Sequence, residues 1–322
     1  MDELTQMGNL IVRRVTQMLL IMLTVSLLLF AIFDSDQFRE KAAVAELGGF
    51  GVATLSADDY HEWLEKKGLN ERFLARYGRW LESVLHGDMG QSIEKDIAVS
   101  VLLKESLTNT GILAFFVFLI MIPVSLTLGV LAGMNTGSPL DRVISIVAVL
   151  TTSIPQIATA VLLTVILALG LGWVPTKSAM ADGWSFRGLV LPLLTLLLYD
   201  IGYLVRMTRA AMTEVMASQY IRTAVLKGLP YRRVILRHAL RNALIVPVTL
   251  IFLELNGLLS QVVVVEVFFQ YAGFGRMLFD AANFGDLQVL QAATLVAVCV
   301  AVGSQLLSDA AYVFLNPRVR FT

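Results

Sequence analysis

Apolar residues gather into six long blocks along the chain, each near the length that a helix needs to cross a membrane. A bilayer core about 30 Å thick takes about 20 residues in helical form. The blocks cover approximately residues 15–33, 111–133, 144–171, 189–205, 244–268 and 289–314. The pattern therefore predicts an all-α membrane protein with six transmembrane helices.

The composition supports a membrane protein. Of the 322 residues, 57% are hydrophobic and only 16% are charged, whereas soluble domains carry about 25% charged residues. The first block could instead be a secretory signal, because it follows Arg13 and Arg14. However, it continues into an acidic stretch at residues 34–36 without a small-residue cleavage site. We therefore expect an uncleaved first helix.

Two glycines lie four residues apart in the second block. Gly129 and Gly133 share one face of a helix. Small residues at this spacing let two helix backbones approach closely inside a membrane. We expect this face to pack against another helix of the chain.

Basic residues concentrate between the fourth and fifth blocks. Residues 206–241 hold eight Lys and Arg residues, and Glu214 is the only acid among them. Short loops rich in Lys and Arg stay on the cytoplasmic side of a membrane. With six spans, both termini are then cytoplasmic as well, in agreement with Arg13 and Arg14 before the first span.

This topology divides the chain into three parts. They are an N-terminal tail with the first helix, an outer insertion, and a core domain of helices two to six, at residues 1–33, 34–108 and 109–322. The core contains the basic cytoplasmic loop at residues 206–243. Acids outnumber bases in the insertion, as expected for an outer segment.

The insertion has a helical pattern of its own. Four apolar residues recur at helical spacing and predict one apolar face, formed by Phe73, Tyr77, Trp80 and Val84. This face could cap the outer mouth of a pore. It could equally belong to an amphipathic helix that lies on the membrane or on the rest of the protein, and the sequence leaves both open.

The basic loop has a helix–glycine–helix pattern. Gly228 can take the left-handed conformation that ends a first helix. Pro230 suits the first turn of a second helix, where its missing N–H costs nothing. A compact element of this kind can pass force to a cytosolic partner. The alternative is a basic loop held at anionic lipid headgroups.

The residues of this loop resemble the conserved cytoplasmic loop of ATP-binding-cassette (ABC) importer permeases. They are most similar to the B-type permeases of the dipeptide, oligopeptide and nickel group. That group's pattern runs Tyr-Val-Arg-Thr-Ala-x-x-Lys-Gly-Leu, followed by Arg-x-x-x-x-x-His-Ala-Leu-Arg-Asn-Ala. This chain matches the pattern at Tyr220, Arg222, Thr223, Ala224, Lys227, Gly228, Leu229, His238, Ala239, Leu240, Arg241, Asn242 and Ala243.

Other segments extend the resemblance over most of the chain. Similar motifs lie at residues 87–92, 141–142 and 153–155, and at Glu266, Gly273, Gly275 and Arg276. Two departures concern the outer side. Ala272 stands where the family usually has proline, and the Pro-Gly-Asp-Pro motif expected after the first span is absent.

The resemblance implies a type I ABC importer permease fold (MetI-like), in a multi-pass subunit of the bacterial inner (cytoplasmic) membrane. A second permease, of the C-type, would complete the pore as a heterodimer. Two cytosolic ABC ATPases would dock on the loops, and a periplasmic substrate-binding protein would deliver a peptide or peptide-like solute. The residues that couple to the ATPase would be Tyr220, Arg222, Thr223, Ala224, Lys227, Gly228 and Leu229. Candidates for an outer gate are Glu266, Gly273 and Gly275.

The sequence carries no pattern typical of an enzyme. It has no phosphate-binding loop of the Gly-x-x-x-x-Gly-Lys-Ser/Thr type. Its histidines, His61, His86 and His238, are scattered, and Cys299 is the only cysteine. We expect no metal and no cofactor in this chain, with ATP and Mg bound by the partner ATPase, and no nucleic-acid partner. A self-sufficient channel or secondary carrier is the main alternative, but neither would need an inner docking element.

Three polar residues fall inside predicted spans. Asp200 lies in the fourth block, and Glu254 and Asn256 lie in the fifth. Ionisable residues at this depth usually face a cavity or a partner. They are candidates for lining the translocation pathway, where they would favour a cationic or amine-bearing solute. The alternative is a set of buried, hydrogen-bonded carboxyl groups that hold helices in register.

Overall fold

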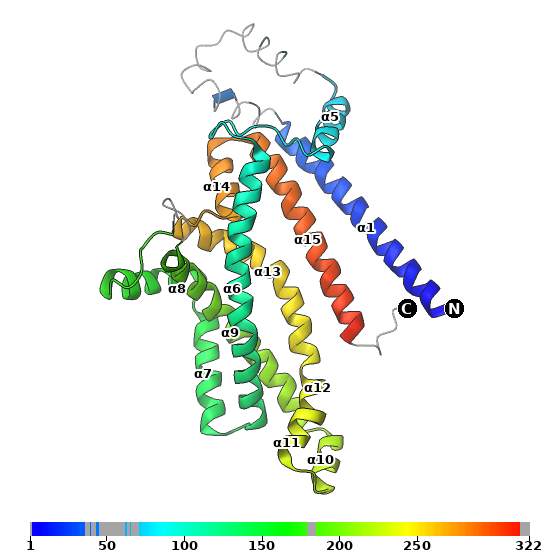
Figure 1. Ribbon diagram of the computed structural model, residues 1–322, viewed down its shortest axis with the longest axis vertical. Coiled ribbons are helices and arrows are strands. Elements are labelled where there is room, and N and C mark those ends of the chain that lie inside the picture. The colour runs from blue at the N-terminus through cyan, green and yellow to red at the C-terminus, as the bar shows by residue number, and fades with distance from the viewer. Residues whose placement is uncertain are drawn as a thin grey trace. The chain divides into compact units, whose positions relative to one another are not determined.

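The computed structural model describes residues 2–35, 71–178 and 185–315, together with Arg39, Ala43, Val44, Glu62 and Glu65. Side chains are described for all of these except residues 2–12, 14, 15, 256, 259 and 309–315. The described chain is helical, apart from loops and one isolated bridge between Gln91 and Ala98 (Figure 1). Much of the predicted outer insertion therefore lies outside the described residues.

In the described part of the chain, four helices are long and apolar enough to cross a membrane as single segments: α1 (Asp2–Phe33), α6 (Val99–Met134), α9 (Phe186–Met216) and α15 (Leu287–Leu315). Up to seven spans result if three bent helix pairs each cross once. The predicted all-α, multi-spanning architecture is thus confirmed. The number six and the three-part domain division stay predictions.

The third predicted span is not one straight helix. α7 (Pro139–Ser153) and α8 (Gln156–Leu163), which continues into the π-helical segment η1 (Thr164–Gly170), meet at an angle of 102°. Ile154, between them, has extended backbone with ψ of 126°. The ring of Pro155 disfavours helical backbone at the residue before it. The predicted third span is therefore not a single unbroken helix, although the bent pair together is still long and apolar enough for one span.

The chain forms two compact units, Met1–Thr108 with Arg276–Gly303, and Asn109–Gly275 with Ser304–Thr322. In the second unit, α9 is the central helix, because α7, α8 and α13 (Ile245–Phe269) all pack against it. The apolar core of this unit includes Leu113 and Met121 of α6, Leu196 of α9, and Val262 and Phe269 of α13.

The two glycines of α6 lie against α9. A Cβ atom added to Gly129 would collide with Thr208, and one added to Gly133 would collide with Met212. The two helix backbones can approach this closely only because these positions carry no side chain. The close packing predicted for this face is therefore confirmed.

In the first unit, α5 (Phe73–Leu85) packs on α1. The ring of Phe30 lies 5.5 Å, between centroids, from each of Phe73, Tyr77 and Trp80. The hydroxyl groups of Ser26 and Tyr77 lie 2.7 Å apart. The predicted apolar face thus exists and covers part of the protein's own first helix.

The same unit fixes the segment that precedes α6. Asp286 is buried and accepts hydrogen bonds from the Ser92 hydroxyl at 2.6 Å and the Ile93 N–H at 2.9 Å. Gln288 accepts a hydrogen bond from the Gln91 N–H at 2.6 Å. The motif at residues 87–92 therefore holds its loop to the turn between α14 (Phe274–Phe284) and α15.

The contact of α6 with α9 gives a first prediction. Gly133→Leu should lower the thermal unfolding temperature of the detergent-purified protein, because overpacking of a filled interface costs about 1–3 kcal/mol. Gly111→Leu on the same helix is the matched control, since no atom lies within 4 Å of a Cβ added there. Equal unfolding temperatures for the two variants would contradict the packing described here.

Candidate functional site

The basic loop folds as four short helical segments after α9: α10 (Gln219–Leu226), α11 (Tyr231–Arg233), η2 (Val234–Ala239) and α12 (Leu240–Ala243). Gly228 has φ of +73° and lies between α10 and α11. Pro230 occupies the N-cap position of α11, one residue before the first turn. The predicted helix–glycine–helix pattern is therefore confirmed.

One face of α10 holds the loop together. Ile221 and Ala224 are buried and pack in a cluster with Met212 of α9 and with Val234 and Ile235 of η2. The hydroxyl group of Tyr220 accepts a hydrogen bond from the Asn242 amide at 2.9 Å. These contacts make the loop a compact element at the end of α9.

The opposite face of α10 is exposed. We call Arg222, Val225, Leu226 and Lys227 the docking face; all four side chains are exposed, and Leu226 is 79% exposed. The first three recur at helical spacing and so share one side of the helix. Large apolar side chains beside basic ones, uncovered by this chain, are typical of a surface that another protein covers.

The structure separates the predicted coupling residues into two groups. Arg222, Thr223, Lys227 and Gly228 are exposed, whereas Ala224 is buried and Leu229 is partly buried. Thr223 donates its hydroxyl proton to the carbonyl oxygen of Gln219 at 2.9 Å. Ala224 and Leu229 therefore act through packing within the loop. Coupling to an ATPase stays a prediction for the exposed residues.

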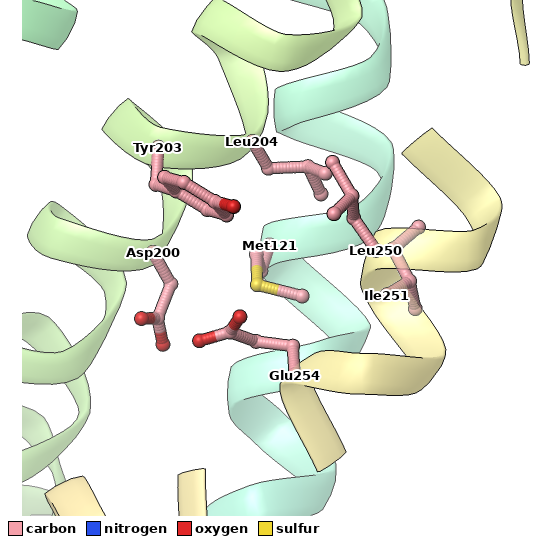
Figure 2. A pocket seen from close by; sticks show the side chains of 7 residues that line it. All are labelled: Met121, Asp200, Tyr203, Leu204, Leu250, Ile251 and Glu254. Carbon is pink, nitrogen blue, oxygen red and sulfur yellow. The ribbon is translucent and has the colours of Figure 1, made fainter. Parts of the chain in front are cut away.

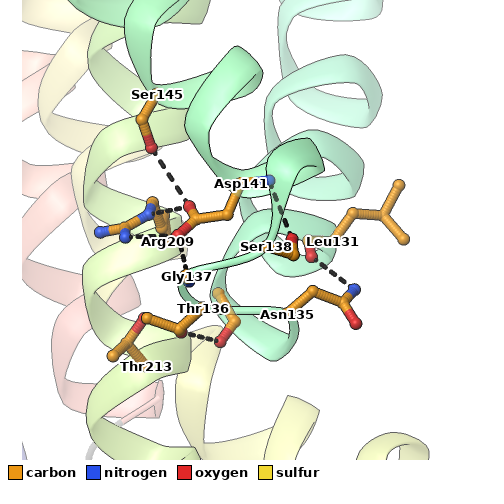
Figure 3. A network of polar contacts seen from close by, with 10 residues as sticks. Leu131, Asn135, Thr136, Gly137, Ser138, Asp141, Ser145, Arg209 and Thr213 are labelled. Carbon is orange, nitrogen blue, oxygen red and sulfur yellow. Dashed lines mark hydrogen bonds and ion pairs between the residues drawn. The ribbon is translucent and has the colours of Figure 1, made fainter.

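A polar network lies before the loop, where α7 begins (Figure 3). Asp141 is buried and forms an ion pair with the guanidinium group of Arg209 on α9, with Nη2 at 2.8 Å from Oδ2. The same carboxylate accepts hydrogen bonds from the Gly137 N–H and the Ser145 hydroxyl. The Ser138 hydroxyl caps α7 by accepting from the Asp141 N–H.

The sequence placed Asp141 in a family motif and Arg209 in the basic stretch at residues 206–241, without pairing the two. The two residues are 68 positions apart, and a single sequence contains nothing that pairs them. A partial signal was present, because an acid three residues after a Ser-Pro helix start lies at the positive end of the helix dipole.

The outer gate candidates meet at the end of α13. Glu266 is fully buried and accepts hydrogen bonds from the Thr110 hydroxyl at 2.5 Å and the Gly275 N–H at 2.7 Å. A Cβ atom added to Gly273 would overlap the Glu266 carboxylate. The three candidates therefore form one tightly packed turn. Their role as a gate stays a prediction.

Two of the pathway candidates also meet. Asp200 of α9 and Glu254 of α13 point their carboxyl groups toward one another in a narrow recess (Figure 2). Asp200 is 1% exposed, and both of its oxygens lack a hydrogen-bond partner among the described residues. Glu254 accepts a hydrogen bond from the Gln261 amide at 3.2 Å. The side chain of Asn256 lies outside the described residues.

Glu254 is hydrogen-bonded, but to Gln261 of its own helix, so the alternative of carboxyl groups that hold helices in register also stays a prediction. Whether either residue contacts a solute stays a prediction. Within the described part of the chain, no group of three or more His, Cys, Asp and Glu side chains is placed to hold a metal ion.

Comparison with known proteins supports the resemblance carried by the loop. Residues 125–321 match the family described as binding-protein-dependent transport system inner membrane component. The chain is 34% identical over 320 residues to a putative peptide transport system permease protein of Brucella abortus, covering 98% of this chain and 100% of the relative. It is 30% identical over 322 residues to the oligopeptide transport system permease protein AppB of Bacillus subtilis, with the same coverage.

A more distant relative gives the same result. The oligopeptide transport system permease protein OppB of Salmonella typhimurium is 28% identical over 308 residues, which cover 94% of this chain and 95% of the relative. The resemblance to ABC importer permeases of the peptide group is thus confirmed. The chain belongs to the family of binding-protein-dependent transport system inner membrane components, as a multi-spanning permease subunit.

Proposed function

We propose that this chain forms part of the pore of an ABC importer and that its docking face binds a separate cytosolic ATPase. The observation that carries this proposal is the two-sided character of α10. One side is buried against η2, and the other exposes Val225 and Leu226 beside Arg222 and Lys227. A self-sufficient channel or secondary carrier would have no need for this face.

The proposed solute is a peptide or a peptide-like small molecule. This rests on the relatives, which are named peptide and oligopeptide transport permeases. The proposed complex contains a second, C-type permease, two ABC ATPases and a periplasmic substrate-binding protein. ATP and Mg would be bound by the ATPases, not by this chain.

The proposed orientation places the docking face and both termini in the cytoplasm. Its support is the charge of residues 206–241, where bases far outnumber acids. The proposed location is the bacterial inner membrane, in agreement with the family description.

The Asp141 network gives the docking face a rigid connection to the membrane helices. α9 runs directly into the loop, and the Asp141–Arg209 ion pair ties α9 to the start of α7. Arg206 of α9 also donates a hydrogen bond to Thr152 of α7 at 3.4 Å. Movement of the loop would therefore be transmitted to α7 and α9 together, not absorbed by bending between them.

Introducing a negative charge on the docking face tests whether this face binds the ATPase. Leu226→Asp should reduce recovery of the ATPase with the tagged permease at least about tenfold, a loss equivalent to about 1.4 kcal/mol, because a carboxylate would be desolvated in an apolar contact. The measurement is co-purification from detergent-solubilised membranes, with the permease level as reference.

The matched control is Leu85→Asp on α5. Leu85 is 78% exposed, nearly as much as Leu226, but belongs to the other compact unit and is not part of the loop. Both variants should insert into the membrane normally. Equal ATPase recovery with both would show that α10 is not the contact.

The ion pair gives a third prediction. Asp141→Asn should lower the stability of the purified permease by about 1–2 kcal/mol, because it removes charge-assisted hydrogen bonds whose value is reduced by the partial exposure of Arg209. Peptide uptake should fall while the ATPase still co-purifies. Glu105→Gln, which removes an exposed carboxylate from α6, is the control for thermal unfolding and uptake. An unchanged unfolding temperature for Asp141→Asn would show that the ion pair does not hold α9 to α7.

A further inference from the structure

Two acidic side chains face each other inside the second unit, and no described residue that lines the recess between them is a base. The recess between them is lined by Met121 of α6, by Asp200, Tyr203 and Leu204 of α9, and by Leu250, Ile251 and Glu254 of α13 (Figure 2). This lining contains no Lys, Arg or His. Two carboxylates in such surroundings repel each other, because Asp200 is buried and Glu254 is partly buried, so that little water screens their charges.

Among the described side chains, the polar contacts of Glu254 lead to neutral groups. Gln261 donates to Glu254, and Gln156 of α8 donates to Gln261 at 3.3 Å. Tyr203 is the only other titratable group in the lining. Arg206, the next base along α9, is exposed and donates to Thr152 of α7.

The size of the recess limits what can neutralise the pair. It leaves no room for a particle as large as a water molecule, so a hydrated ion or the ammonium group of a solute would require the helices to separate. A proton needs no such space. Carboxyl pairs that share a site commonly hold one proton between them, because both cannot ionise at once.

We propose that Asp200 and Glu254 together bind one proton, in a carboxyl–carboxylate site between α9 and α13. When that proton leaves, the two negative charges push the helices apart. α9 leads into the cytoplasmic loop and α13 follows it, so the spacing of these helices sets the spacing of the two ends of the loop. The proton-binding site stands on this chain alone; its effect on transport rests on the proposed function.

Infrared spectroscopy of the purified permease tests the site without any partner. At neutral pH, the difference between the wild type and the Asp200→Asn/Glu254→Gln double variant should contain the C=O stretching band of one protonated carboxyl group, and the band should disappear as the pH rises. The difference between the wild type and Glu105→Gln should lack it. Absence of the band from the first difference would overturn the proposal.

ATP hydrolysis by the complete transporter complex in nanodiscs tests the effect on transport. The wild-type rate should fall several-fold from neutral to alkaline pH, because the pair loses its proton. Asp200→Asn, which retains only one acid, should lose most of this dependence, and Glu105→Gln should behave as the wild type. Identical pH profiles for the wild type and Asp200→Asn would overturn the link to the loop, even where the infrared band is present.

A role in contacting solute has a different signature. If Asp200→Asn keeps the wild-type pH profile but lowers uptake of trilysine relative to trialanine, the acids line the pathway and the proton proposal is wrong. If the ATPase does not co-purify with the wild-type permease, the proposed function is wrong. The infrared result, which needs no partner, would still support the proton-binding site.

Discussion

The second unit depends on the close packing of α9 against its neighbours. Between helices in lipid, the hydrophobic effect supplies little attraction, so van der Waals contact and buried polar bonds must hold the helices together. Gly129 and Gly133 of α6 allow α9 to approach, and the Asp141–Arg209 pair fixes it to α7. Because α9 is held in this way, the loop at its end has a defined position.

Much of this arrangement was predictable from the sequence. The apolar blocks predicted the helices, because length and hydropathy alone decide which segments can cross a bilayer. Gly228 and Pro230 predicted the turn in the loop, since both act through their own backbone. The face of Phe73, Tyr77 and Trp80 followed from helical periodicity, although its partner, Phe30, did not.

The errors and omissions have a common cause. A hydropathy pattern is an average over many residues, so it does not register the effect of a single proline. Pro155 lies within an apolar block, but the chain bends by 102° at this point. Two pairs of residues are close in space but distant in sequence: Asp141 with Arg209, and Asp200 with Glu254. Only the packing of whole helices brings the members of each pair together. Sequence reasoning identified Asp200 and Glu254 as unusual, but could not indicate that they face each other.

Coupling to an ATPase requires the exposed side of α10 to lie in the cytoplasm, where an ATPase can cover it. The most direct measurement is the accessibility of a single thiol, introduced by Leu226→Cys in a Cys299→Ser background, to a membrane-impermeant maleimide. We expect no labelling in intact cells, labelling in inside-out vesicles, and protection when the ATPase is bound. Labelling from outside intact cells would contradict both the topology and the proposed coupling.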